Sequence, residues 1–425
     1  MSYRNLAIPC GIVCLAVLLT AGDAVAQAAG APLLRLEDAF ARALSNAPAL
    51  QAANEASRAA DAGIRLADRR INPTLDIGVE NAAGSGAYHL LDRAETTLSI
   101  SQTLERGGDR AARTGLARTE ANAVRADGAV RRQDILLDVE LAYITAQTAA
   151  ADLAVANDRL AVAKEIVATV DRRVKAARDP LMAASRAQAL LSEADIAVTS
   201  ARLADEAARR RLASYWRSEA AFSIDLSSFG NLAAKDAPES GANASPEITR
   251  ARAEEDRATA AVQVERARVR PDATVSAGVR YFHEYDEAAL VVGVSIPLSI
   301  WNTNSAALDR AEAERAKSRL ETEALKRNVA RELASAAAQI DIARAEVESI
   351  DAQLLPAARQ TLDRAREGYA AGGFSYLDVL DAQRVLVDAQ LRRNATLASY
   401  HRARAALARL TGAYAGAAPA GEISR

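Results

Sequence analysis

The sequence contains two copies of one unit, and this duplication constrains the fold more than any other feature. Pro48 and Pro73 in the first copy correspond to Pro246 and Pro271 in the second, and both pairs are separated by 198 residues. The run around Pro73 reads I-N-P-T-L-D-I-G-V, and the run around Pro271 reads V-R-P-D-A-T-V-S-A-G-V. A repeat of this kind indicates that one supersecondary unit is built twice from the same elements.

Each copy shows the pattern of a short helix, a strand hairpin and a long helical hairpin, in that order. From these patterns we predict a signal peptide at 1–26 and two repeats joined by a linker of little regular structure at 221–244. The first repeat, at 27–220, has a β-hairpin at about 73–104 and a helical hairpin at about 109–215. The second repeat, at 245–412, has a β-hairpin at about 271–300 and a helical hairpin at about 303–411, and a flexible tail follows at 413–425.

Long helices are predicted by apolar residues that recur at alternating steps of three and four along 139–174 and 333–354. Such steps average about 3.5 residues, the period of helices that coil around neighbours. A helix over 109–174 would extend on the order of 100 Å at about 1.5 Å per residue. Because aromatic residues make up only 4% of the chain, alanine-rich seams between helices are favoured over a bulky globular core. We expect Pro356 to kink the second long helix.

Four runs in the two predicted β-hairpins alternate apolar and polar residues, as Leu75, Ile77 and Val79 do in the first. Each run has about the length that a tilted transmembrane strand needs. Two soluble hairpins packed on the helices would show the same alternation. In a membrane, four strands cannot close a barrel, and open edges would leave backbone groups unpaired. Three chains would supply twelve strands, so we expect a trimer.

The first residues indicate export. Arg4, an apolar run at 6–20 and the triplet A-V-A before Gln27 form a secretory signal with a cleavage site, and the apolar run is too short for a membrane span. Both cysteines, Cys10 and Cys14, lie in this segment without the context of a lipid-anchored protein. The mature chain therefore has no disulfide framework or catalytic thiol. A net charge of −2 argues against nucleic-acid binding, and no residue set predicts an enzyme or a cofactor.

The run Y-A-A-G-G-F-S-Y-L-D-V-L-D-A-Q, residues 369–383, joins the two helices of the second helical hairpin. Gly372 and Gly373 suit the left-handed backbone that ends a helix, and Ser375 with Asp378 three residues later forms a capping-box pattern. Asp378 and Asp381 share one helix face. Aspartates are common at helix starts for dipole reasons alone, so this spacing is compatible with solvent as well as with a pore.

The repeat, the strand hairpins and the closing run from 354 to 412, which ends in A-L-A-R-L-T-G, together resemble the TolC-type outer-membrane efflux proteins. The likeness covers nearly the whole mature chain. The runs S-I-S-Q-T-L-E-R-G-G-D-R-A-A-R and G-V-S-I-P-L-S-I-W-N-T-N-S resemble most the CzcC type of heavy-metal cation efflux systems. Trp301 stands where an aromatic residue is common in that type, and Asn302 and Asn304 match its asparagines.

The resemblance implies a mainly α fold with a transmembrane β-barrel portion: a homotrimeric 12-stranded β-barrel in the outer membrane, continued by an α-helical barrel through the periplasm. The helical end would contact a periplasmic adaptor protein that is bound to an inner-membrane RND pump. In the family, two aspartates of the D-V-L-D segment project into the closed periplasmic aperture, and a tyrosine before the hairpin glycine helps to hold it shut. The matching residues are Asp378, Asp381 and Tyr369.

The chain departs from the family pattern at both hairpin turns. Phe374 stands where some members have an arginine, which argues against a charged latch at that position. In the first hairpin, Ala177 and Arg178 stand where a glycine is frequent. Asp179, directly before Pro180, reads as a capping residue for the next helix.

These observations predict a passive exit duct of a tripartite RND-type efflux system, with heavy-metal cations as cargo. Two alternatives stay open: an exit duct for drugs or a secreted protein, and a soluble periplasmic coiled-coil scaffold. We expect no resident metal site. His89 and His283, in the predicted external loops, lie in no chelating pattern, so the sequence leaves their contact with metal undecided.

Overall fold

The structure is a computed structural model that describes residues 32–89, 91–216, 221–232 and 245–416. Its strands are β1 (Leu33–Leu34), β2 (Thr74–Glu80), β3 (Glu95–Leu104), β4 (Ser223–Ile224), β5 (Ala273–Phe282) and β6 (Glu287–Ser295). Its α-helices are α1 (Leu36–Asn46), α2 (Pro48–Ala67), α3 (Asp109–Lys175), α4 (Leu181–Ala213), α5 (Pro246–Ala267), α6 (Ser305–Ser349), α7 (Leu355–Ala371) and α8 (Tyr376–Thr411). The predicted signal peptide lies outside the described residues.

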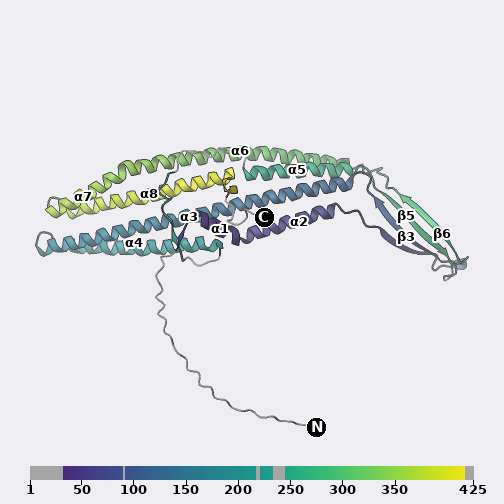
Figure 1. The fold of residues 1–425 in the computed structure, drawn as a ribbon, viewed down its shortest axis with the longest axis horizontal. Helices are drawn as coiled ribbons and strands as arrows, with labels where there is room; N and C mark the ends of the chain where they lie inside the picture. Colours follow the sequence, from purple (N-terminus) through teal and green to yellow (C-terminus); the bar gives the residue numbers. More distant parts are fainter. Residues whose placement is uncertain (1–31, 90, 217–220, 233–244, 417–425) are drawn as a thin grey trace, which may run out of the picture.

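The molecule is an elongated rod with a β-sheet at one end (Figure 1). α2, α3, α5 and α6 extend to the sheet, and the turns of the α3–α4 and α7–α8 hairpins lie at the opposite end. α3 has 67 residues, which corresponds to about 100 Å. All eleven positions of its predicted seam between Val139 and Val174 are buried or half-buried, so the mainly α prediction and the helix period are confirmed. Among the described residues, no helix combines the length and apolar character that a membrane crossing requires.

The sheet has the strand order β2-β3-β5-β6, and every neighbouring pair is antiparallel. The central pair joins the two repeats, since Ile100 of β3 lies opposite Ala277 of β5. β6 ends at Ser295, so the predicted hairpin to about residue 300 is too long. Pro297 explains the difference, because proline has no backbone N–H to donate to a neighbouring strand. One long edge of β2 and one of β6 pair with no other strand among the described residues.

The register places the apolar side chains on one face of the sheet. Ile77, Leu98, Val279 and Leu290 follow one another across the four strands, and between 49% and 76% of each is exposed. The opposite face carries polar residues in the neighbouring register positions, Asp76 among them. A sheet with one apolar and one polar face, neither of them covered by a helix of the same chain (Figure 1), is not the packed soluble hairpin of the alternative interpretation.

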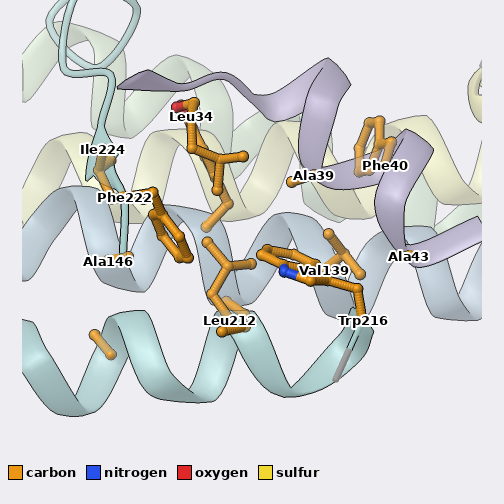
Figure 2. Close-up of a cluster of buried hydrophobic side chains, with 14 of the residues drawn as sticks. Leu34, Ala39, Phe40, Ala43, Val139, Ala146, Leu212, Trp216, Phe222 and Ile224 are labelled. Atoms are coloured by element: carbon orange, nitrogen blue, oxygen red, sulfur yellow. The ribbon is translucent and has the colours of Figure 1, made fainter. Parts of the chain in front are cut away.

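The largest buried cluster lies at mid-length of the rod, where the N-terminal segment crosses the long helices (Figure 2). Phe40 of α1, Leu212 of α4 and Phe222 meet Val139 of α3. The hydroxyl of Tyr143 donates a hydrogen bond to the Leu34 carbonyl at 3.1 Å, while β1 pairs in parallel with β4. This cluster fixes both ends of the first repeat to α3.

One prediction about an irregular segment needs correction here. The tail prediction is wrong for Ala413–Gly416, a 3-10 helix whose Tyr414 is only 6% exposed. The hydroxyl of Tyr414 bonds to Glu140 and to the Ala405 carbonyl. An isolated aromatic residue gives no periodic signal, so the sequence did not indicate this contact. In the predicted linker, residues 221–232 have little regular structure apart from β4, although Phe229 is buried, and residues 233–244 lie outside the described residues.

The second long helix is interrupted before Pro356, as predicted, by a π-helical turn at Ile350–Leu354. A π-turn widens the helix and so accommodates the missing N–H and the bulky ring of the proline. Beyond the turn, the rod bends and α7 continues beside α8 (Figure 1). The first repeat has no such turn, because α3 runs unbroken to Lys175.

Candidate functional site

The turn between α7 and α8 forms as the sequence predicts. Gly372 has φ of 89° and ends α7 in the left-handed conformation, where a side chain would be strained. The N–H of Gly373 donates to the Gly368 carbonyl at 2.8 Å, as in a Schellman-type helix end. Ser375 and Asp378 then cap α8 reciprocally. The turn presents the first residues of α8 at the extreme end of the rod (Figure 1).

Asp378 and Asp381 are both exposed in the first turns of α8. The Asp378 carboxylate accepts hydrogen bonds from the Ser375 hydroxyl at 2.7 Å and from the Ser375 backbone N–H at 2.8 Å. These bonds lower the pKa of Asp378, so it is ionised at neutral pH. Asp381 has no hydrogen bond or ion pair within the described part of the chain. Capping accounts for Asp378, whereas nothing in the single chain accounts for Asp381.

Three side chains join the two hairpin turns, and we call them the tip latch: Arg173, Asp179 and Tyr369. The guanidinium of Arg173 pairs with the Asp179 carboxylate at 2.9 Å and donates to the Tyr369 carbonyl at 2.8 Å. The Tyr369 hydroxyl donates to Asp179 at 2.5 Å. The Arg173 guanidinium also lies 4.6 Å from the centre of the Tyr369 ring, within cation–π range. The latch thus links α3 and the first turn to the end of α7.

The prediction that Asp179 caps α4 is wrong. Pro180 occupies the cap position of α4, and no side chain accepts a hydrogen bond there. The carboxylate of Asp179 instead serves Arg173 and Tyr369, and the Arg173 hydrogen bond is the main reason why the pKa of Asp179 is lowered. The absence of an arginine at Phe374 does not remove the charged contact, because Arg173 supplies it from the other hairpin. Sequence reasoning missed Arg173 because its contact with Tyr369 is set by packing between the repeats.

Apolar packing supports the latch from the helix side. Tyr369 is 5% exposed and Tyr376 is 8% exposed, and both pack with Val170 of α3 and Leu362 of α7. The two tyrosine rings lie 6.1 Å apart between their centres. Burial is the main reason why the pKa of Tyr369 is raised, so its hydroxyl keeps its proton and remains a donor to Asp179 across the physiological range.

Ala177 in the first turn adopts the left-handed conformation, with φ of 57°. A glycine is frequent at this position in the family that the sequence resembles, and a residue with a Cβ atom has a conformational free energy roughly 1 kcal/mol higher there. We expect Ala177→Gly to raise the free energy of unfolding by about 0.5 to 1 kcal/mol, which a thermal melt of the purified protein would register as a higher midpoint. Ala176→Gly is the matched control, because Ala176 has φ of −86°; equal midpoints for the two variants would contradict the strain argument.

The two loop histidines are not brought into a common site. His283 donates its backbone N–H to the Ala94 carbonyl at 3.0 Å, and its ring lies edge-on to Tyr281. His89 follows the short 3-10 helix at Gly86–Tyr88 in the other loop. Within residues 32–89, 91–216, 221–232 and 245–416, no group of three or more His, Cys, Asp or Glu side chains is arranged to hold a metal ion.

A family model described as outer membrane efflux protein matches residues 39–216 and 238–413. The two matches correspond to the two copies of the repeat. The chain belongs to the outer membrane efflux protein family. Its membership agrees with a fold in which both hairpin turns lie at one end of a long helical rod and the sheet at the other (Figure 1).

Curated relatives in this family are named for metal resistance. The chain is 29% identical to the cobalt-zinc-cadmium resistance protein CzcC of Cupriavidus metallidurans, over 89% of this chain and 90% of that protein. It is 31% identical to the nickel-cobalt-cadmium resistance protein NccC of Alcaligenes xylosoxydans xylosoxydans, over 76% of this chain and 73% of that protein. It is also 33% identical to the nickel and cobalt resistance protein CnrC of Cupriavidus metallidurans, over 73% and 74%.

Solved structures confirm the fold. CusC, studied for its folding and transmembrane channel formation, superposes with a TM-score of 0.73 at 20% identity, over 88% of this chain and 91% of that one. The outer membrane protein VceC of Vibrio cholerae gives 0.72 at 20% identity, over 89% and 96%. The predicted family resemblance, including its CzcC-like character, is therefore confirmed.

Proposed function

We propose that this protein is the outer-membrane exit duct of a tripartite RND-type efflux system that exports heavy-metal cations. The observation that carries the proposal is the sheet, whose register puts exposed Leu, Ile and Val on one face and, on β2, β3 and β5, mainly charged, hydroxyl or glycine residues on the other. Such a sheet suits lipid on one side and water on the other. The metal cargo is inferred from the names of the three curated relatives.

We propose further that the duct assembles as a homotrimer. The edges of β2 and β6 have no strand partners within the described residues, and an open edge in lipid leaves backbone groups unpaired. Pairing of β6 with β2 of the next chain would close twelve strands from three copies. The helical rods would then surround a tunnel that reaches a periplasmic adaptor and its inner-membrane pump. We propose that the predicted N-terminal signal exports the chain to this compartment.

The polar face of the sheet fits the wall of a water-filled duct. The Arg280 guanidinium lies 3.0 Å from Glu95 and 3.4 Å from Glu80, and Ser101 donates to Asp76 at 3.0 Å. These residues sit on the face opposite to Leu98 and Val279. In a soluble scaffold the apolar face would meet water instead, an exposed area that monomeric soluble proteins avoid.

A resistance assay tests the function and the cargo together. Deleting the gene should sensitise the host to zinc, cobalt or cadmium, and the chain supplied in trans should restore growth. If the chain restores resistance to drugs but not to metals, the duct exports another cargo than metal cations. If the purified protein is a water-soluble monomer, the duct itself is excluded, because its exposed strand edges and apolar face would then have no covering.

We propose that Asp378, Asp381 and Tyr369 belong to the periplasmic aperture, with Gly372 and Gly373 as its turn. Six carboxylates around a threefold axis would repel one another and attract cations. Asparagine at 378 and 381 keeps the capping oxygen and removes the charge, so Asp378→Asn with Asp381→Asn should weaken block by multivalent cations and lower the preference of the channel for cations over anions. Planar-bilayer recording measures both.

The matched control for this pair is Asp363→Asn, which removes an exposed carboxylate from the side of α7. Its block by multivalent cations and its preference for cations over anions should equal those of the unaltered chain. If the double variant at 378 and 381 behaves like this control, the two aspartates do not line the aperture, and Asp378 is a capping residue only.

A further inference from the structure

The two ends of the sheet carry opposite charge. The three charged connections at the helix end, residues 65–70, 105–113 and 265–272, hold nine arginines and five carboxylates, which leaves four net positive charges. The two loops at the other end, residues 80–95 and 280–287, hold two arginines and six carboxylates, which leaves four net negative charges. The whole chain has a net charge of only −2, so this separation is a local feature of the sheet.

Five of the arginines at the helix end have no partner for their side chains among the described residues: Arg65 in the last turn of α2, and Arg69, Arg70, Arg106 and Arg270 in the connections between helix and sheet. All five are exposed. Their neighbours differ, since Arg110 pairs with Asp68, Arg113 with Glu105 and Arg268 with Glu265. Asp68, Glu105 and Glu265 are thus already engaged by other arginines, and the guanidinium groups of the four connection arginines, Arg69, Arg70, Arg106 and Arg270, remain available to an external anion.

The connections that hold these arginines contact one another. The side-chain amide of Gln102 donates to the Ile71 carbonyl at 2.9 Å, and the backbone N–H of Arg106 donates to Asp272 at 3.2 Å. A Cβ on Gly107 would lie 2.3 Å from the Ala267 carbonyl oxygen, so the connections of the two repeats touch there. The four arginines therefore belong to one continuous collar at the base of the sheet.

The fourth connection, residues 296–304, has no charge and supplies an apolar and aromatic surface to the same collar. Trp301 is 94% exposed, and Leu298 is 76% exposed. The amide of Asn304 binds this connection to the end of α5 through the Glu265 carbonyl, at 2.8 Å. Leu298 continues the alternation of the apolar face beyond β6. A tryptophan at the edge of an apolar band is typical of the boundary between hydrocarbon and headgroups.

We infer that this collar binds the phosphate groups of anionic phospholipids in the leaflet that faces the helical rod. Guanidinium groups bind phosphate oxygens in a bidentate manner, and basic residues beside a membrane are attracted to anionic lipid. The inference rests on the proposed insertion of the sheet into a bilayer. Beyond the proposed function, the inference specifies which class of lipid headgroup is bound, in which leaflet, and which residues orient the sheet along the membrane normal.

Quenching of tryptophan fluorescence by brominated lipids tests which lipid contacts the collar. The chain has two tryptophans, and Trp216 is buried in the helical core, so quenching in vesicles reports on Trp301. In mixtures of brominated phosphatidylglycerol and brominated phosphatidylcholine, we expect the anionic lipid to be preferred by about tenfold. Replacing Arg69, Arg70, Arg106 and Arg270 together by glutamine should reduce this preference to nearly none.

The matched control replaces four exposed arginines of the helical hairpins by glutamine: Arg186, Arg202, Arg359 and Arg364. This variant removes the same charge and should keep the preference. Raising the salt from about 50 mM to about 0.5 M should weaken the preference of the unaltered chain, a result that requires no variant to fold.

Equal quenching by the two lipids, a preference that survives the four collar substitutions, or a preference insensitive to salt would each overturn the inference. A change of conductance in the collar variant with unchanged lipid preference would place these arginines on the water-filled side and overturn it as well. If neither lipid quenches Trp301, the sheet is not in the bilayer, and the proposed duct fails instead.

Discussion

A chain carrying Gly278→Ala is expected to lose most of its assembled outer-membrane form. A Cβ at position 278 would lie 2.4 Å from the Leu98 carbonyl oxygen and 2.7 Å from the Ser99 Cα atom. Both are backbone atoms of the central strand β3, so they cannot rotate away as a side chain would. The cost should lie at the upper end of the roughly 1–3 kcal/mol typical of overpacking, and it falls on the one strand pair that joins the two repeats.

The matched control is Gly78→Ala, because a Cβ at position 78 would have no neighbour within 4 Å. Both glycines are in strands, so the control separates the clash from the general effect of replacing glycine in a sheet. Outer-membrane fractions and the heat-resistant band of the unboiled protein on gels measure the assembled form. Equal amounts of assembled protein from the two variants would show that β3 and β5 accommodate the added methyl group at position 278 without loss of assembly.

The periodic parts of this fold could be predicted from the sequence because each has a repeating physical cause. The seam along α3 is buried or half-buried at every predicted position, since steps of three and four keep one helix face toward its neighbours. The alternating runs became strands, and the turn at Gly372 has the positive φ that glycine permits. These features depend on residues close to one another in the chain.

Features that depend on contacts between distant segments could not be predicted. The tip latch joins residues 173, 179 and 369, whose roles are decided by how α3 packs against α7. Asp179 has the local pattern of a capping residue, but a half-buried guanidinium and a tyrosine hydroxyl offer its carboxylate stronger partners. The burial of Tyr414 and Phe229 was likewise not predicted, because single aromatic residues find their pockets only in the assembled fold.

Breaking the tip latch should have the largest effect on the proposed duct. Arg173→Gln removes the ion pair with Asp179 and the hydrogen bond to the Tyr369 carbonyl. Both charged side chains of the pair are at most 15% exposed, so a loss of about 2–3 kcal/mol is expected for the charged bonds. If the latch holds the aperture closed, that loss would shift the ratio of open to closed apertures by roughly 30- to 150-fold. Planar-bilayer recording should show long open periods of high conductance.

The control for the latch is Arg178→Gln, which removes the same charge from an exposed arginine in the same turn. Its conductance should match that of the unaltered chain; if Arg173→Gln also matches it, the latch does not govern the aperture. Acid offers an independent test. Because Arg173 holds the pKa of Asp179 below its ordinary value of 3.8, the latch should be intact at and above that pH and should loosen only as the pH falls through the lowered pKa. In Arg173→Gln the chief cause of the lowering is gone, so any remaining contact between Asp179 and Tyr369 should be lost at a higher pH than in the unaltered chain.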